Sequence, residues 1–175
     1  AQYKLDGPRL HKGIQRLKAA ILWQMTFPGV PSVYYGDEIG LQGYRDPYCR
    51  GTYDWENGDA ELRQWTRKLI HLRNKHTALQ TGSILPIYAK GDVYGYARVI
   101  DKQKDVFGME AENEVFIVLI NRSSEPRHAS LDVRDLAAGI MVDALGDRPD
   151  IRIMRGRLEV DIPAYAGLVY QHKPV

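Results

Sequence analysis

The chain has 175 residues, of which 44% are hydrophobic and 26% charged, a composition typical of a folded globular protein. Its 24 Lys and Arg residues nearly balance its 22 Asp and Glu residues, and the formal charge of +2 is spread along the chain. This pattern argues against a nucleic-acid partner, which needs a concentrated basic surface. The longest apolar run, residues 19–27, is interrupted by Gln24 and Thr26 and is far shorter than the roughly 20 residues that cross a bilayer, so we expect no membrane span.

Cysteine and histidine usage gives no sign of a metal or cofactor. The single cysteine, Cys49, excludes an internal disulfide framework and a thiolate zinc site. The five histidines share no metal-ligand spacing and are interpreted as surface residues. The compartment stays open, with a cytoplasmic location slightly favoured over a secreted one. The N-terminus has no initiator Met and no visible signal peptide, and it looks like a cut made inside a longer chain.

The first predicted elements are a helix and a short strand. From Leu10 to Phe27 apolar residues recur at three- and four-residue steps until Pro28 ends the pattern, which predicts a helix. Residues 19–23 are apolar on most sides of this helix, so we expect more protein to cover it than a small domain provides. Residues 32–35 (Ser-Val-Tyr-Tyr) are typical of a strand that is buried on both faces.

Residues 37–59 lack periodicity, and their length is typical of a functional loop. Four aromatic residues favour an ordered loop: Tyr44, Tyr48, Tyr53 and Trp55. Asn57 or Asp59 is expected to cap a second helix, which ends at Gly82 in a left-handed conformation. Because one strand between two helices cannot bury itself, residues 1–82 are interpreted as the end of a larger α/β domain.

From Ser83 onward, short β-rich runs recur at roughly ten-residue intervals between turn residues, which predicts an all-β antiparallel sandwich over residues 83–175. Val115–Ile120 is apolar throughout and is expected to form a central strand buried on both faces. Residues 101–114 are interpreted as a hairpin excursion outside the core. The predicted strands are 84–89, 93–100, 115–121, 128–133, 140–144, 158–162 and 168–172.

Several segments carry a family resemblance. Phe27-Pro-Gly-Val-Pro-Ser-Val-Tyr-Tyr-Gly-Asp-Glu-Ile-Gly40 resembles the segment that enters and follows the eighth barrel strand in the α-amylase superfamily of glycoside hydrolases, family 13. Asp46-Pro-Tyr-Cys-Arg50, followed by Trp55, is similar to the next loop in the neopullulanase, cyclomaltodextrinase and amylopullulanase branch. Residues 69–73, 93–98 and 118–121 resemble that family's eighth helix and C-terminal sandwich.

The resemblance implies an α+β fragment with two domains. Residues 1–82 would be the last helix-strand-helix part of a (β/α)8 barrel, and residues 83–175 the C-terminal β-sandwich. The full-length protein would hydrolyse α-glucosidic bonds with retention, with an α-glucan oligosaccharide or polysaccharide as its partner. A carbohydrate-binding or a purely structural sandwich module is the alternative function. No tryptophan follows Trp65, which counts against a binding module, and the strands from Ser83 onward hold few exposed aromatic residues beyond Tyr88, Tyr94, Tyr96, Tyr165 and Tyr170.

The resemblance also implies that the catalytic carboxyl groups precede Ala1, because in the family they follow the fourth, fifth and seventh barrel strands. No catalytic residue is therefore assigned, and we expect the chain to be inactive without the N-terminal barrel of the same polypeptide. Asp37 and Glu38 are neighbours on a segment expected to be extended, so their side chains would point apart and are predicted to anchor the loop. Bond specificity, oligomeric state and calcium dependence are not determined by this sequence.

Asp46, Arg50 and Tyr44 are the predicted substrate-binding residues, because the family's equivalent loop borders the glycone side of the cleft. Carboxylate and guanidinium groups make directional hydrogen bonds to vicinal hydroxyls, and an aromatic ring stacks on a pyranose. Two alternatives stay open. Asp46 and Arg50 pair with each other as a structural salt bridge, or the loop aromatics pack only to hold the loop.

Overall fold

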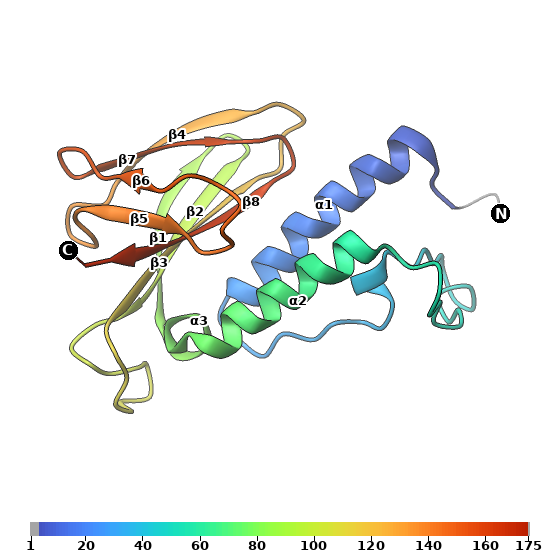
Figure 1. Cartoon of the computed structure of the whole chain (residues 1–175), viewed down its shortest axis with the longest axis horizontal. Helices are drawn as coiled ribbons and strands as arrows, with labels where there is room; N and C mark the ends of the chain where they lie inside the picture. Colours follow the sequence, from blue (N-terminus) through green and yellow to red (C-terminus); the bar gives the residue numbers. More distant parts are fainter. Residues whose placement is uncertain (1–3, 175) are drawn as a thin grey trace.

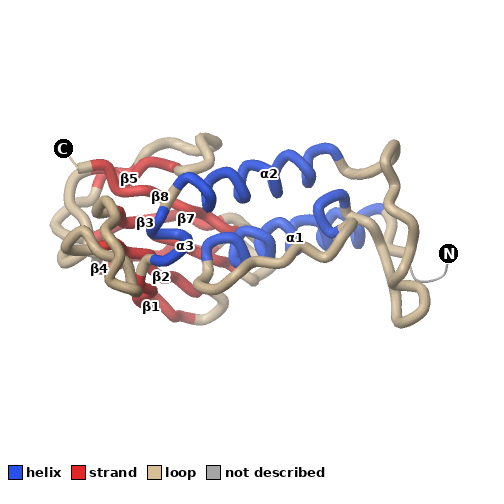
Figure 2. The backbone as a smooth tube through the Cα atoms, turned by 90° about the horizontal axis from the view of Figure 1, so that it is seen from below, coloured by secondary structure: helices blue, strands red, loops and turns tan. Residues whose placement is uncertain are grey.

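The computed structural model describes residues 4–174, and it contains a pair of helices that meets an antiparallel sandwich at one end (Figure 1). Figures 1 and 2 show helices α1 and α2 side by side, with the sandwich at one end of the pair and the loop of residues 36–59 at the other. The helical elements are α1 (Gly7–Thr26), η1 (Asp37–Ile39), α2 (Ala60–Lys75) and α3 (Thr77–Thr81).

Helix α1 begins three residues before the predicted start and ends one residue before the predicted end. Asp6 is its N-cap and a proline lies in the first turn, where the fixed φ of proline suits a helix. The helix ends before Pro28, as the sequence predicts. One stripe is buried, including Ile21, Leu22 and Met25, whereas Trp23 on another face is 48% exposed. The predicted cover around residues 19–23 is therefore present on one side of the helix only.

The second predicted helix is divided and does not end as expected. Asp59 is the N-cap of α2, and its Oδ1 accepts a hydrogen bond from the backbone N of Leu62 at 2.8 Å. Gly82 follows the short helix α3 with a φ of −69°, which is not the left-handed conformation that we predicted. A Cβ at this position would lie 2.4 Å from the carbonyl oxygen of Ala78. Glycine is required here by close backbone approach, not by a positive φ.

The predicted strand at residues 32–35 is not formed: residues 32–34 have no regular secondary structure, Tyr35 lies in a turn, and the segment belongs to neither sheet, which corrects the sequence interpretation. Tyr34 and Tyr35 are 54% and 42% exposed, although both were expected to be buried. A strand is defined by hydrogen bonds to a neighbouring strand, and residues 28–35 run back along the helix pair without one (Figure 2). In this structure the segment therefore forms no strand, and its two tyrosines are not buried.

The sandwich is unequal, with one large and one small sheet. The large sheet has the order β1-β2-β3-β8-β5-β6, the small sheet consists of β4 and β7, and all pairs are antiparallel. The strands predicted after Ser83 are all present, and the sequence pattern misses only the two-residue β6. The bounds are β1 (Ser83–Lys90), β2 (Val93–Ile100), β3 (Glu114–Asn121), β4 (Arg127–Asp132), β5 (Ile140–Asp143), β6 (Ile151–Arg152), β7 (Arg157–Ile162) and β8 (Gly167–Lys173).

The two faces of the large sheet belong to two hydrophobic clusters. Along β3, Ile117 and Leu119 contribute to the cluster between the sheets, whereas Phe116 and Val118 contribute to the cluster with the helices. All four side chains are fully buried, which confirms the predicted central strand with both faces covered. Strand β7 of the small sheet alternates exposed and buried residues, as its sequence predicts. Residues 101–113 form the expected excursion between β2 and β3, one residue shorter than predicted because Glu114 begins β3.

Buried polar groups join the helices to the large sheet. Arg98 on β2 donates hydrogen bonds to the carbonyl oxygens of Thr26, Leu79 and Gly82 at 2.5, 2.9 and 2.9 Å. His76, which we expected at the surface, is 8% exposed, and its Nδ1 lies 2.5 Å from Oε1 of Glu114. These contacts satisfy polar groups at helix ends that water does not reach. Over residues 4–174, the structure has no helix with the length and apolarity needed to cross a membrane.

Candidate functional site

The loop of residues 36–59 is closed at its base by a backbone hydrogen bond. The backbone N of Asp59 donates to the carbonyl oxygen of Ile39 at 2.9 Å, so the two ends of the loop are joined. Gly36 has a φ of +91°, and a Cβ there would lie 2.7 Å from the Leu41 side chain. The prediction of an ordered loop after residue 36 is therefore confirmed, and glycine is required at its first corner.

Asp37 and Glu38 lie in the short helix η1 and not on an extended segment, which corrects the basis of our prediction. Oε2 of Glu38 accepts a hydrogen bond from the backbone N of Gly36 at 2.9 Å, so the predicted anchoring role is confirmed for Glu38. Partial burial raises the pKa of Asp37, and the neighbouring charge of Glu38 raises it further. The pKa of Tyr53 is also raised, first by desolvation and then by its hydrogen bond to Glu38.

The structure brings two of the three predicted substrate-binding residues together. Nε of Arg50 lies 2.9 Å from Oδ1 of Asp46, and the two side chains are 73% and 65% exposed. The salt bridge that we considered as an alternative is therefore formed. Both groups remain accessible, and an exposed ion pair of this kind contributes little to stability. Tyr44 lies on the same loop and is 53% exposed.

Further along the loop, two aromatic side chains contact each other. The rings of Tyr53 and Trp55 lie 4.6 Å apart, and Trp55 is 82% exposed. The hydroxyl of Tyr35 donates to the carbonyl oxygen of Gly51 at 3.0 Å, which fixes the loop to the preceding segment. Tyr35 therefore packs to hold the loop, while Trp55 remains available to a ligand.

A small cavity lies under the loop, and the sequence analysis did not identify Tyr34 and Tyr35 among the residues that line it. Its volume is about 200 Å³, and Tyr34, Tyr35, Asp37 and Tyr48 are among its lining residues. We expected Tyr34 and Tyr35 to be buried in a sheet, so they were not candidates. The signal available in the sequence is their position directly before Gly36, at the end of the predicted strand. In barrel and open α/β folds, this end of a strand is where sites form.

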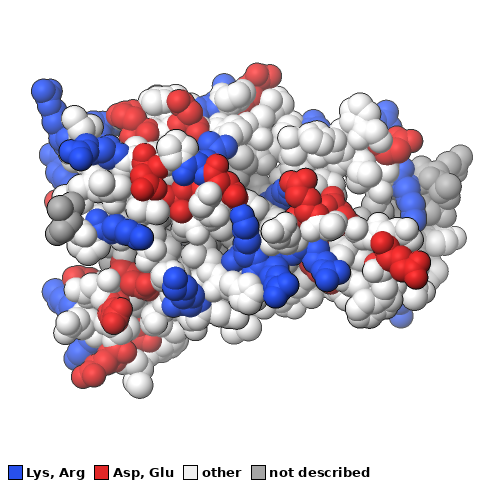
Figure 3. Space-filling view, in the orientation of Figure 1, with Lys and Arg blue, Asp and Glu red and all other residues white. Residues whose placement is uncertain are grey.

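The electrostatic surroundings are mixed in sign. Figure 3 shows Lys and Arg side chains interspersed with Asp and Glu over the visible face, in agreement with the formal charge of +2. Within residues 4–174, no three His, Cys, Asp or Glu side chains are arranged to hold a metal ion. The chemistry available at the loop is therefore hydrogen bonding by a carboxylate and a guanidinium next to exposed aromatic rings, which suits a neutral polyhydroxylated ligand.

Comparisons with known proteins identify the family. No family model matches the chain. An amylopullulanase from Thermoanaerobacter thermohydrosulfuricus is 36% identical over 160 residues, which are 89% of this chain and 11% of that protein. A cyclomaltodextrinase from Geobacillus thermopakistaniensis is 31% identical over 172 residues, which are 94% of this chain and 27% of that protein. The α-amylase of Geobacillus thermoleovorans, solved with acarbose, has a TM-score of 0.79 at 25% identity, covering 92% of this chain and 34% of that chain.

The fold and the loop, taken with these relatives, define the class: the chain belongs to the α-amylase superfamily of glycoside hydrolases, family 13. Its sequence relatives are amylopullulanases, cyclomaltodextrinases and neopullulanases, which is the branch that the loop motif predicts. The predicted fold class is confirmed as a barrel-end segment followed by an antiparallel sandwich. The chain spans about a tenth of the amylopullulanase and about a quarter of the cyclomaltodextrinase.

Proposed function

We propose that this chain is the C-terminal portion of a retaining glycoside hydrolase that degrades α-glucans. In this proposal residues 1–82 supply the last strand, the flanking helices and a substrate-facing loop of a (β/α)8 barrel. Residues 83–175 form the accessory β-sandwich. The partners are an α-glucan oligosaccharide or polysaccharide and the N-terminal barrel of the same polypeptide.

One observation carries this proposal: the segment that resembles the last barrel strand exposes apolar side chains and pairs with no strand of the described residues. Val30 is 97% exposed, Tyr34 54% and Phe27 37%. Soluble proteins rarely leave a contiguous apolar surface beside an unpaired extended segment, because both favour association. The remaining barrel strands and helices would cover this surface and supply the missing hydrogen bonds.

The division at residue 82 separates the two parts along the sequence but not in space. Helix α3 ends at Thr81 and β1 begins at Ser83, which supports the proposed boundary after residue 82. Leu22 of α1, Leu69 of α2 and Val118 of β3 nevertheless belong to one buried cluster. We propose that the sandwich stabilises the last barrel helices by sharing this core, which is the structural role expected for such a module.

The catalytic carboxyl groups are proposed to lie outside this chain. Retention needs a nucleophile and an acid/base about 5 Å apart on either side of the bond. Asp37 and Glu38 are consecutive residues, and Glu38 is already bound to the backbone N of Gly36. We therefore assign neither a catalytic role. Asp46, Arg50 and Tyr44 are assigned to substrate binding on the open face of the loop.

The test compares this 175-residue protein with a longer version that includes the preceding residues of its own polypeptide. We expect release of reducing sugar from starch, pullulan or cyclodextrin by the longer protein only. In that protein, Arg50→Ala should raise KM about tenfold or more, because a charged hydrogen-bond donor is lost. Arg134→Ala, in an exposed ion pair on the sandwich, is the matched control and should leave KM unchanged. Turnover by the short chain, or none by the longer one, contradicts the proposal.

A further inference from the structure

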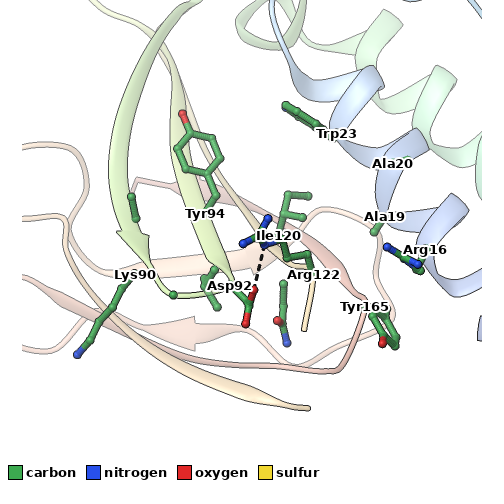
Figure 4. A pocket seen from close by; sticks show the side chains of 14 residues that line it. Arg16, Ala19, Ala20, Trp23, Lys90, Asp92, Tyr94, Ile120, Arg122 and Tyr165 are labelled. Carbon is green, nitrogen blue, oxygen red and sulfur yellow. Dashed lines mark hydrogen bonds and ion pairs between the residues drawn. The ribbon is translucent and has the colours of Figure 1, made fainter. Parts of the chain in front are cut away.

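A groove lies between helix α1 and the sandwich, separate from the loop of residues 36–59. Its volume is about 720 Å³, within the roughly 300–1,000 Å³ typical of small-molecule sites. One wall is α1, and the other consists of the β1–β2 turn and the end of β3 (Figure 4). We call it the α1–sandwich groove; its lining side chains include Arg16, Trp23, Asp92, Tyr94, Arg122 and Tyr165.

Aromatic side chains come from both walls of the groove. Trp23 on α1 is 48% exposed, and Tyr94 on β2 comes from the opposite wall (Figure 4). Each of the two rings contacts another aromatic ring. Trp23 lies 5.7 Å from Phe27 in an edge-to-face contact, and Tyr94 lies 5.7 Å from Tyr96. Fixed aromatic faces on two sides suit a flat apolar surface such as the C–H face of a pyranose.

Directional polar groups lie at the rim beside these rings. Nε of Arg122 lies 3.0 Å from Oδ1 of Asp92, and the two side chains are 78% and 39% exposed (Figure 4). The backbone N of Arg122 also donates to the carbonyl oxygen of Asp92 at 3.0 Å, so the pair is held by backbone and side chain together. A carboxylate and a planar guanidinium side by side match the vicinal hydroxyls of a sugar.

The groove is preformed, because both of its walls are packed against the rest of the protein. Leu22, directly before Trp23, is fully buried, and a Cβ at Gly167 would lie 3.0 Å from its side chain. Tyr165, at one end of the groove, is contacted by Lys12 at 5.1 Å and by Arg16 at 5.7 Å from its ring centroid. A ligand would therefore bind without ordering flexible segments, which limits the entropic cost.

We propose that the α1–sandwich groove is an accessory binding site for an α-glucan segment. The choice of α-glucan as the ligand rests on the proposed function; the location of the site rests on the groove itself. One or two glucose units would lie between Trp23 and Tyr94, with their hydroxyl groups on Asp92 and Arg122. The site would hold a polysaccharide chain on the enzyme at a distance from the loop that contains Asp46 and Arg50.

The experiment is calorimetric titration of maltoheptaose into the 175-residue protein, with tryptophan fluorescence as a second readout. We expect a dissociation constant of about 1 mM. This constant should not depend on salt concentration, because the ligand is neutral. Trp23→Ala should weaken binding at least tenfold, and Arg122→Ala should weaken it severalfold without disturbing the core. Phe107→Ala, at an exposed aromatic residue in the excursion between β2 and β3, is the matched control and should leave the affinity unchanged. Circular dichroism and thermal melting of each variant exclude unfolding as the cause of a loss.

Three results would overturn the proposal. No binding at about 10 mM maltoheptaose would exclude a useful site. Binding that survives Trp23→Ala and Arg122→Ala but is lost in Trp55→Ala would place the glucan on the loop. Loss of fluorescence response in the longer protein would mean that the preceding part of the polypeptide fills the groove. None of these results affects the hydrolysis test, so failure of the accessory site is distinguishable from failure of the proposed function.

Discussion

Arg98 is a buried cation that joins the helices to the sandwich, and its replacement is the most informative perturbation of this fold. Its side chain is fully buried and donates to carbonyl oxygens at the ends of α1 and α3. Helix C-termini carry partial negative charge, so these carbonyl groups take the place of a carboxylate partner. Burial lowers the pKa of Arg98 to about 10, and the nearby charge of Arg73 contributes to the lowering.

The expected cost of Arg98→Met follows from the groups that it leaves behind. A buried carbonyl oxygen without a donor costs about 1–3 kcal/mol. The variant leaves three such carbonyl oxygens without the donor that Arg98 supplies. The variant also removes an unpaired buried charge, which relieves part of the desolvation cost of the native state. We therefore expect a net loss of about 3–4 kcal/mol, a large share of the about 5–15 kcal/mol typical of a domain.

Urea unfolding followed by circular dichroism measures this loss as a shift in the midpoint at unchanged slope. Arg98→Lys is the conservative variant and should lose less, because one ammonium group still reaches some of the carbonyl oxygens. Arg134→Met, at an exposed position, is the control and should leave the midpoint nearly unchanged. A loss below about 1 kcal/mol for Arg98→Met would show that the carbonyl groups find other partners, and the reasoning would be wrong.

Three further predictions concern single sites. Asp59→Ala removes the N-cap of α2 and should cost about 1 kcal/mol in urea unfolding; no change would mean that the cap contributes nothing. Gly82→Ala should destabilise the protein more than Gly91→Ala. Gly82 has an ordinary φ but no room for a Cβ, whereas Gly91 has room for a Cβ at a φ of +58°. A larger loss of stability for Gly91→Ala would refute this reasoning. Hydrogen bonds to Asp161 and Glu159 raise the pKa of His128 above its ordinary value of 6.5. These hydrogen bonds therefore stabilise the folded protein below pH 6.5, and the stabilisation is lost as the pH rises through the raised pKa of His128. NMR titration of the imidazole should show a lower pKa in Glu159→Gln, and an unchanged pKa would contradict the assigned cause.

The candidate site was predicted in part. The spacing of Asp46 and Arg50 allows contact within one turn, and the structure brings the two together. Glu38 was expected to anchor the loop, and it binds the backbone N of Gly36. The positions of Tyr34 and Tyr35 could not be predicted, because burial of a strand depends on neighbours that are distant in sequence. Sugar binding by Tyr44, Asp46 and Arg50 stays a prediction.

Local sequence patterns determined the elements of this protein. Helical periodicity located α1 and α2, and alternating or continuous apolar runs located β1–β5, β7 and β8, because side-chain direction repeats with the period of each element. The continuous apolar run of β3 also indicated that both of its faces are covered. Resemblance to known motifs, and not periodicity, indicated the family.

Only the tertiary structure decided what covers each face. The sequence did not indicate that helices would pack on one face of the large sheet and two strands on the other, nor that Arg98 would be buried at the helix ends. It also did not indicate that Gly82 is required by the backbone of Ala78. These features depend on contacts between residues far apart in the chain, and such contacts leave no periodic signal in the local sequence.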